Sequence, residues 1–194
     1  MTLLLILTSF LLGSLPFAVW LGRLAGVDPR QVGDGNPGAF NAWKAGGRRI
    51  GIPVLLLDFS KGVIPPALAY QVWGWRGWPL VAISVAPVLG HAFSPFLGGR
   101  GGKGLAAAFG VWAGLTLAEG PLALGAALTV GTLGLRWRDG WVITLGLAAL
   151  LADVLLRYPA WEMVVIWGVL AALLLWKYRQ AFGWPLCKED GESA

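Results

Sequence analysis

The 194-residue sequence contains a single cysteine, Cys187, and a single histidine, His91. One cysteine cannot form a disulfide within the chain, which excludes a secreted disulfide scaffold. One histidine without further cysteines or clustered carboxylates offers no metal site. Charged residues make up only 13% of the chain, against about 25% in soluble domains, so the composition also argues against a soluble enzyme and a disordered chain.

Apolar residues are abundant instead, since they form 57% of the chain and the mean hydropathy is +0.68. Such a composition predicts an all-α, polytopic integral membrane protein, with helices of about 20 residues crossing a hydrocarbon core of about 30 Å. We expect one transmembrane domain over residues 1–187, a polar, frayed tail at 188–194, and about seven spans, of which the fourth to sixth are short. The expected spans are Leu3–Leu24, Gly51–Trp73, Trp78–Leu97, Gly104–Ala118, Pro121–Leu135, Trp141–Leu156 and Trp161–Trp176.

Basic residues are distributed unevenly between the two sides of this expected topology. With the N-terminus outside, one side carries twelve lysines and arginines and the other only Arg76 and Arg157, while Lys61 lies within a span. Because loops rich in these residues stay in the cytoplasm, we predict an external N-terminus and a cytoplasmic C-terminus. The same bias explains the net charge of +5 without a nucleic-acid partner. The twelve are Arg23, Arg30, Lys44, Arg48, Arg49, Arg100, Lys103, Arg136, Arg138, Lys177, Arg179 and Lys188.

A glycine-rich turn, Gly33–Gly38, precedes a predicted short helix. Glycines in such a turn allow positive φ angles and let backbone N–H groups approach a ligand closely. Asn36 followed by Pro37 is typical of a helix N-cap and first helical position. Turn and helix N-terminus together predict a phosphate cradle, with Asn41 and Lys44 on one face of the helix. The pattern alone leaves an ordinary interfacial turn and helix equally open.

A second glycine-rich segment, Gly98–Gly104, contains five glycines around Arg100 and Lys103. It resembles a Walker A loop, but Leu97 stands where that motif requires its first glycine, and Gly104 replaces the serine or threonine that binds magnesium. ATP hydrolysis is therefore disfavoured. Two cations in an open backbone loop still suit an anion. The alternative is a flexible loop whose charges only orient the protein in the membrane.

Two charged residues, Asp58 and Lys61, lie three positions apart within the second expected span. Ionisable residues at membrane depth are costly and normally pair or line a site, and we expect a structural ion pair that orients the helix. His91, near the end of the third expected span, is either a hydrogen-bonded packing residue or a substrate contact, and we favour packing. Ser14 and Pro16 are expected to bend the first span.

Several of these segments follow one another in the order and spacing of a known family. They are Gly13–Phe17, Val32–Asn41, Asp58–Gly62 and Gly90–Leu97 continuing into Gly101–Gly104. In these segments the chain resembles the bacterial acyl-phosphate:glycerol-3-phosphate acyltransferase family of integral membrane enzymes. The resemblance implies seven spans, an external N-terminus, cytoplasmic motifs and a place in the bacterial cytoplasmic (inner) membrane.

The resemblance also implies a reaction, the transfer of a fatty acyl group from acyl phosphate to the 1-hydroxyl of glycerol 3-phosphate, which forms lysophosphatidate for phospholipid biosynthesis. The two substrates and the lipid bilayer are the partners implied, and no metal or nucleotide cofactor is. Acyl phosphate is an activated mixed anhydride, so positioning and charge neutralisation can supply much of the catalysis without a protein nucleophile. The expected catalytic residues are Lys103, Asn41 and His91. The expected phosphate-binding residues are Gly33, Asp34, Gly35, Asn36, Gly38, Lys44, Arg100, Gly101 and Gly102.

The sequence departs from the family pattern at several positions. Asp34, Phe40 and Lys44 stand where the family usually has serine, threonine and arginine. Segments 136–140 and 177–181 lack the family's later serine, histidine and asparagine. A non-catalytic or acceptor-altered paralogue, and a transporter of a small phosphorylated anion, are therefore alternatives. Because a carboxylate facing a bound phosphate would repel it, we expect Asp34 to cap the helix or pair with a cation such as Lys44.

Overall fold

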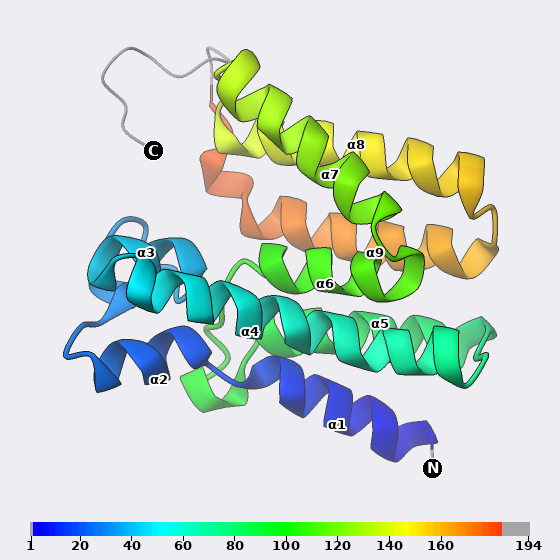
Figure 1. Ribbon diagram of the computed structural model, residues 1–194, viewed down its shortest axis with the longest axis horizontal. Helices are drawn as coiled ribbons and strands as arrows, with labels where there is room; N and C mark the ends of the chain where they lie inside the picture. Colours follow the sequence, from blue (N-terminus) through cyan, green and yellow to red (C-terminus); the bar gives the residue numbers. More distant parts are fainter. Residues whose placement is uncertain (1, 184–194) are drawn as a thin grey trace. The chain divides into compact units, whose positions relative to one another are not determined.

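The computed structural model of the chain describes residues 2–183, and the regular structure of these residues is helical (Figure 1). This confirms the all-helical prediction. The chain divides into two compact units, Met1–Leu115 and the part that begins at Thr116. The division into two compact units does not show whether the units fold as one domain, so the single domain expected over 1–187 stays a prediction. The tail expected at 188–194 lies outside the described residues.

The first unit contains six α-helices and three short helical turns. Apart from Asp58 and Lys61, the charged residues of this unit lie in loops or in the first or last turn of a helix. The α-helices are α1 (Thr2–Ser14), α2 (Phe17–Leu24), α3 (Ala39–Gly46), α4 (Arg48–Ala67), α5 (Gly77–Ala92) and α6 (Leu105–Thr116). The turns are η1 (Pro29–Gln31), η2 (Leu68–Val72) and η3 (Pro95–Leu97).

Close backbone contacts between helices hold this unit together. A β-carbon at Gly13 of α1 or at Gly90 of α5 would lie 2.1 Å from a backbone oxygen of the other helix. Gly62 of α4 and Gly110 of α6 are equally close, at 2.0 and 2.1 Å. Small residues are favoured where membrane helices pack, since they let the backbones approach. These glycines therefore place α1 against α5 and α4 against α6.

The first expected span is broken, because α1 ends at Ser14 and α2 begins at Phe17. Pro16, between them, has no N–H for a helical hydrogen bond. The freed carbonyl groups find side-chain partners, because the Lys61 ammonium group donates to the Leu15 carbonyl at 3.1 Å and the Ser94 hydroxyl donates to the Ser14 carbonyl at 2.6 Å. The expected bend is thus a complete break, stabilised by polar groups from other elements.

Four helical segments of the described part are long and apolar enough to cross a bilayer, and they include the helical turns that continue α4 and α5. The expected sixth span is not short, because α8 (Asp139–Arg157) has 19 residues. Helix α6, in contrast, has 12 residues, a rise of about 18 Å against a core of about 30 Å. The total of seven spans stays a prediction. The four segments are Thr2–Leu24, Arg48–Val72, Gly77–Leu97 and Asp139–Arg157.

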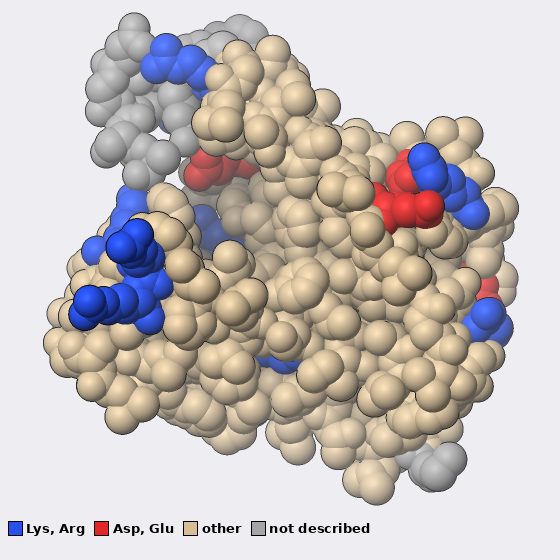
Figure 2. All heavy atoms as spheres, viewed as in Figure 1, with Lys and Arg blue, Asp and Glu red and all other residues tan. Residues whose placement is uncertain are grey.

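The second unit consists of α7 (Glu119–Thr129), η4 (Val130–Gly134), α8, α9 (Trp161–Lys177) and η5 (Arg179–Ala181). A polar cluster joins the start of α7 to the end of α8, where Glu119 accepts hydrogen bonds from Arg157 and Tyr158. Arg157 also pairs with Asp153 one turn earlier, at 3.1 Å. Most atoms in the view of Figure 2 belong to uncharged residues, as a surface facing lipid requires.

Candidate functional site

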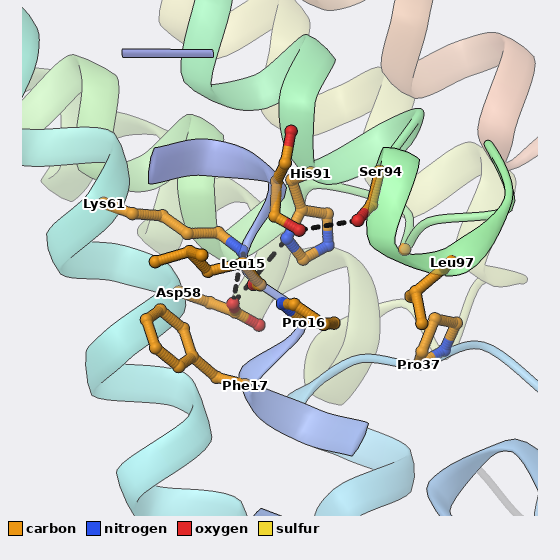
Figure 3. A pocket seen from close by; sticks show the side chains of 11 residues that line it. Leu15, Pro16, Phe17, Pro37, Asp58, Lys61, His91, Ser94 and Leu97 are labelled. Carbon is orange, nitrogen blue, oxygen red and sulfur yellow. Dashed lines mark hydrogen bonds and ion pairs between the residues drawn. The ribbon is translucent and has the colours of Figure 1, made fainter. Parts of the chain in front are cut away.

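The candidate site lies in the first unit, where the break between α1 and α2 meets α4, α5 and the loop after η3. A small pocket there is lined by the break, by Asp58 and Lys61 of α4, and by His91 and Gly102 (Figure 3). Its free volume is about 10 Å³, roughly the space that one water molecule needs. Both glycine-rich segments singled out from the sequence contribute to it, through Pro37 and Gly102.

The two glycine-rich segments also meet through an ion pair between Asp34 and Lys103. The Lys103 ammonium group lies 2.6 Å from Oδ2 of Asp34. The other oxygen, Oδ1, accepts hydrogen bonds from the Asn36 backbone N–H at 3.1 Å and from the Asn41 side-chain amide at 2.9 Å. One carboxylate thus collects an ammonium group, a backbone N–H and an amide N–H. The expected pairing of Asp34 with a cation is confirmed, but the cation is Lys103 and not the example given, Lys44.

The surroundings of Asp34 change its protonation equilibrium. Partial burial alone would raise the pKa of its carboxyl group. The hydrogen bonds from Lys103, Asn36 and Asn41, together with the positive charge of Lys103, outweigh burial and hold this pKa below its usual range. The group is therefore an anion at neutral pH. Its side chain is 49% exposed, against 25% for Lys103, so the ion pair is open to solvent on the Asp34 side.

Helix α3 begins later than expected, because its N-cap is Gly38 and not Asn36. The Asn36 N–H is already bonded to Asp34, and the Gly38 N–H donates to the Asn36 carbonyl at 2.8 Å, so the turn closes before the helix starts. Asp34 consequently caps this turn and not α3. Gly33 has a φ of +57°, and a β-carbon there would lie 2.6 Å from the Asn41 amide oxygen.

Asn41 and Lys44, expected on one face of α3, have different surroundings. Asn41 is 2% exposed and donates to both Asp34 and the Asn36 carbonyl. Lys44 is exposed, and its ammonium group lies 4.7 Å from the centre of the Phe40 ring. Both residues lie in α3 three positions apart, as expected, but their side chains differ in exposure and in partners. Asn41 belongs to the cradle around Asp34, whereas Lys44 lies at the surface beside an aromatic ring.

The loop after η3 packs directly on His91. The Gly102 N–H donates to the His91 carbonyl at 3.0 Å, and a β-carbon at Gly102 would lie 2.2 Å from Nε2 of the imidazole. A β-carbon at Gly101 would lie 1.9 Å from the His91 carbonyl oxygen. These glycines are therefore required for contact with α5 and not only for access to an anion. Arg100, just before them, is exposed.

The ion pair expected between Asp58 and Lys61 is present at the centre of the pocket lining. Nζ of Lys61 lies 2.7 Å from Oδ1 of Asp58, and Nδ1 of His91 lies 3.7 Å from the same oxygen. His91 is 7% exposed. Its imidazole thus lies between the Asp58 carboxylate and the backbone of Gly102, which agrees with the packing interpretation.

Sequence reasoning missed one residue that shapes the site. Ser94 is buried and holds the Ser14 carbonyl at the break between α1 and α2. The one feature of the sequence that could have pointed to Ser94 is its place directly before Pro95, in a segment that resembles a family motif. No cluster of three or more metal-ligating side chains occurs among the described residues.

Comparisons with known proteins agree on one family. Residues 3–184 match the family model described as glycerol-3-phosphate acyltransferase. The chain is 39% identical over 178 residues to glycerol-3-phosphate acyltransferase 1 of Deinococcus radiodurans, covering 92% of this chain and 88% of that protein. It is 35% identical over 172 residues to glycerol-3-phosphate acyltransferase 1 of Thermotoga maritima, covering 82% and 81%.

Two solved structures are also similar to the chain. Both are crystal structures of PlsY (YgiH), an integral membrane glycerol 3-phosphate acyltransferase. The glycerol 3-phosphate form has a TM-score of 0.84 and 31% sequence identity, and the lysophosphatidic acid form has a TM-score of 0.83 and 30% identity. Each match covers 92% of this chain and 88% of the other.

Proposed function

The chain belongs to the family of glycerol-3-phosphate acyltransferases, and we propose that its acyl donor is an acyl phosphate. It is an integral membrane acyltransferase of phospholipid biosynthesis. In the proposed reaction the 1-hydroxyl oxygen of glycerol 3-phosphate forms an ester bond with the acyl carbonyl carbon. The bond between that carbon and the bridging phosphate oxygen breaks, and the hydroxyl proton leaves with the released inorganic phosphate. The other product is lysophosphatidate.

The observation that supports a phosphate substrate at this site is the set of groups around the Asp34 carboxylate. An ammonium group, a backbone N–H and a side-chain amide converge on one anion, as they would on a phosphate oxygen. The donors come from two segments far apart in the sequence, and the fold brings them together. The proposed phosphate site consists of the turn Gly33–Gly38 with Asn41 and Lys103. Arg100 and Lys44 are exposed cations that contribute longer-range attraction.

The proposed chemistry requires no nucleophile from the protein. The phosphate of a mixed anhydride is a good leaving group, so neutralising its charge lowers the barrier directly. Lys103 is the residue we assign to this role. His91 contacts the Gly101–Lys103 loop, and we assign it the role of holding that loop in place.

For the membrane arrangement, we propose seven spans with an external N-terminus and a cytoplasmic C-terminus in the bacterial cytoplasmic membrane. The twelve basic residues against two support this orientation. The fatty chain would enter between helices from the bilayer. A transporter would instead require its anion site near the bilayer midplane, whereas Asp34 and Lys103 lie in loops outside the α-helices.

A direct assay tests the proposal. Purified protein is incubated with palmitoyl phosphate and glycerol 3-phosphate, and lysophosphatidate is followed by mass spectrometry. We expect product with palmitoyl phosphate and none when palmitoyl coenzyme A replaces it. Product from the thioester alone would contradict the proposed donor. No product from either donor would favour a non-catalytic or acceptor-altered paralogue, and other alcohols would then be offered as acceptors.

A further inference from the structure

We propose that Asp34 is an internal competitor of the substrate phosphate, which occupies the phosphate site through its own carboxylate until the substrate displaces it. This inference rests on the proposed function in one respect, the identity of the anion as an acyl phosphate. The geometry behind it is independent of that identity. Lys103, Asn36 and Asn41 all direct donors at the Asp34 carboxylate.

Two of these donors are fully used, because the single Asn36 N–H is given to Asp34 and the two amide hydrogens of Asn41 are given to Asp34 and the Asn36 carbonyl. A phosphate oxygen and a carboxylate oxygen both accept hydrogen bonds from N–H groups at similar distances, and each prefers a charged donor. The Lys103 ammonium group already holds one anion, since it lies 2.6 Å from Oδ2 of Asp34. A phosphate that binds these groups must therefore displace the carboxylate, because two anions at one site repel each other.

The structure also provides a route for displacement. The Asp34 side chain is 49% exposed, so rotation about its own side-chain bonds can move the carboxylate into solvent without burying its charge. Asn41 is 2% exposed and also bonded to the Asn36 carbonyl, so this donor stays in place when Asp34 leaves. The site is therefore preorganised, and only its internal anion has to move.

A nearby residue serves as a matched control. Asp28 lies in the same loop and pairs with Arg30 at 2.7 Å, and the hydrogen bond from Arg30 lowers its pKa to about 2. The Asp28 carboxylate accepts hydrogen bonds from the backbone N–H and the guanidinium group of Arg30. Asp28→Asn thus removes one carboxylate from the loop without freeing the donors around Asp34.

The test compares Asp34→Asn, Asp34→Ser and Asp28→Asn in purified protein. Removing the competing charge should lower KM for palmitoyl phosphate by about two- to fivefold, the range for a partly exposed ion pair. We expect kcat to change little, and Asp28→Asn to retain the KM of the unmodified protein. In a Lys103→Ala background the effect of Asp34→Asn should disappear, because the shared donor is gone. An unchanged or raised KM in folded Asp34→Asn and Asp34→Ser proteins would overturn the proposal.

A second measurement separates this inference from the proposed reaction. The rise in unfolding temperature on titration with inorganic phosphate requires no turnover. We expect Asp34→Asn to respond at phosphate concentrations about two- to fivefold lower than the unmodified protein and Asp28→Asn. If the protein forms no lysophosphatidate but this shift is observed, the competitor role stands and the proposed reaction fails. If it forms lysophosphatidate and neither KM nor the shift changes, the competitor role fails alone.

Discussion

The Lys61 ammonium group lies 2.7 Å from the Asp58 carboxylate, and each of these two side chains is at most 3% exposed. Lys61 also donates to the Leu15 carbonyl in the break between α1 and α2. One ion pair thus joins α4 to the point at which the first membrane segment is interrupted. His91 extends this contact to the Gly101–Lys103 loop, because its imidazole lies near Asp58 and its backbone carbonyl accepts the Gly102 N–H.

Breaking this pair from one side should be more harmful than removing it entirely. Lys61→Met leaves the Asp58 carboxylate buried without its ammonium partner, and Asp58→Asn leaves the Lys61 ammonium group buried without its carboxylate. A buried charge that loses its partner destabilises the folded protein by about 3–5 kcal/mol. The double variant removes both charges and should recover part of that loss. Chemical unfolding in detergent measures the free energies, and Ser60→Ala, an exposed neighbour on α4, is the control. Equal losses in the Lys61→Met variant and the double variant would contradict an energetically coupled pair.

Gly102→Ala should disturb the contact between His91 and the loop that contains Lys103. The added β-carbon would lie 2.2 Å from Nε2 of His91, so the loop or the buried imidazole has to move. We expect a loss of about 1–3 kcal/mol in unfolding free energy, the usual cost of overpacking, together with a lower kcat/KM. Gly168→Ala on α9 meets no atom within 4 Å and should retain stability and activity. Identical behaviour of the two variants would show that the Gly102 contact is not tight.

Lys103→Ala tests the role assigned to the charge opposite Asp34. If Lys103 neutralises the leaving phosphate, kcat/KM should fall by roughly 10²-fold, which corresponds to about 2.7 kcal/mol of transition-state stabilisation. Steady-state kinetics with palmitoyl phosphate provide the measurement. Arg49→Ala, which removes an exposed cation from the same expected side of the membrane, should have near-normal kinetics. Near-normal kinetics for Lys103→Ala would limit this lysine to a role in topology.

The ion pair between Asp34 and Lys103 also predicts a pH dependence of stability. The pKa of Asp34 is lower in the folded protein than in the unfolded chain, where it is about 3.9. Its contribution, at most about 1 kcal/mol for a partly exposed pair, is therefore complete at neutral pH and is lost as the pH falls through the lowered pKa. Unfolding temperatures of the unmodified protein and Asp34→Asn should differ at pH 7 and converge toward pH 3. A difference in unfolding temperature that is independent of pH would show that the ionised Asp34 carboxylate is not its source.

The proposed membrane orientation can be tested with cysteines at exposed alanines. In a Cys187→Ser background, Ala25→Cys lies in the loop expected in the cytoplasm and Ala118→Cys at the opposite side. A membrane-impermeant maleimide should label Ala118→Cys in intact cells and Ala25→Cys only after permeabilisation. Labelling of Ala25→Cys from outside would reverse the orientation.

The sequence by itself determined the helical membrane class, the family and the segments that make up the proposed site. Long apolar runs dictate helices in a bilayer because every backbone polar group must be bonded within its segment. Glycine-rich turns and isolated charges such as Asp58 and Lys61 can also be recognised in the sequence, since each interrupts an apolar segment. Their three-residue spacing made the ion pair predictable from helix geometry.

Only the tertiary structure decided which distant groups meet. The partner of Asp34 is Lys103 and not the nearer Lys44, because packing of the helices brings the second glycine-rich loop against the first. Likewise, Gly102 is glycine because His91 lies against it, and the break before Phe17 is stabilised by Lys61 and Ser94 from other elements. Local sequence patterns encode spacing along one helix. Contacts between elements depend on how whole helices pack, and a single sequence contains no direct signal for that.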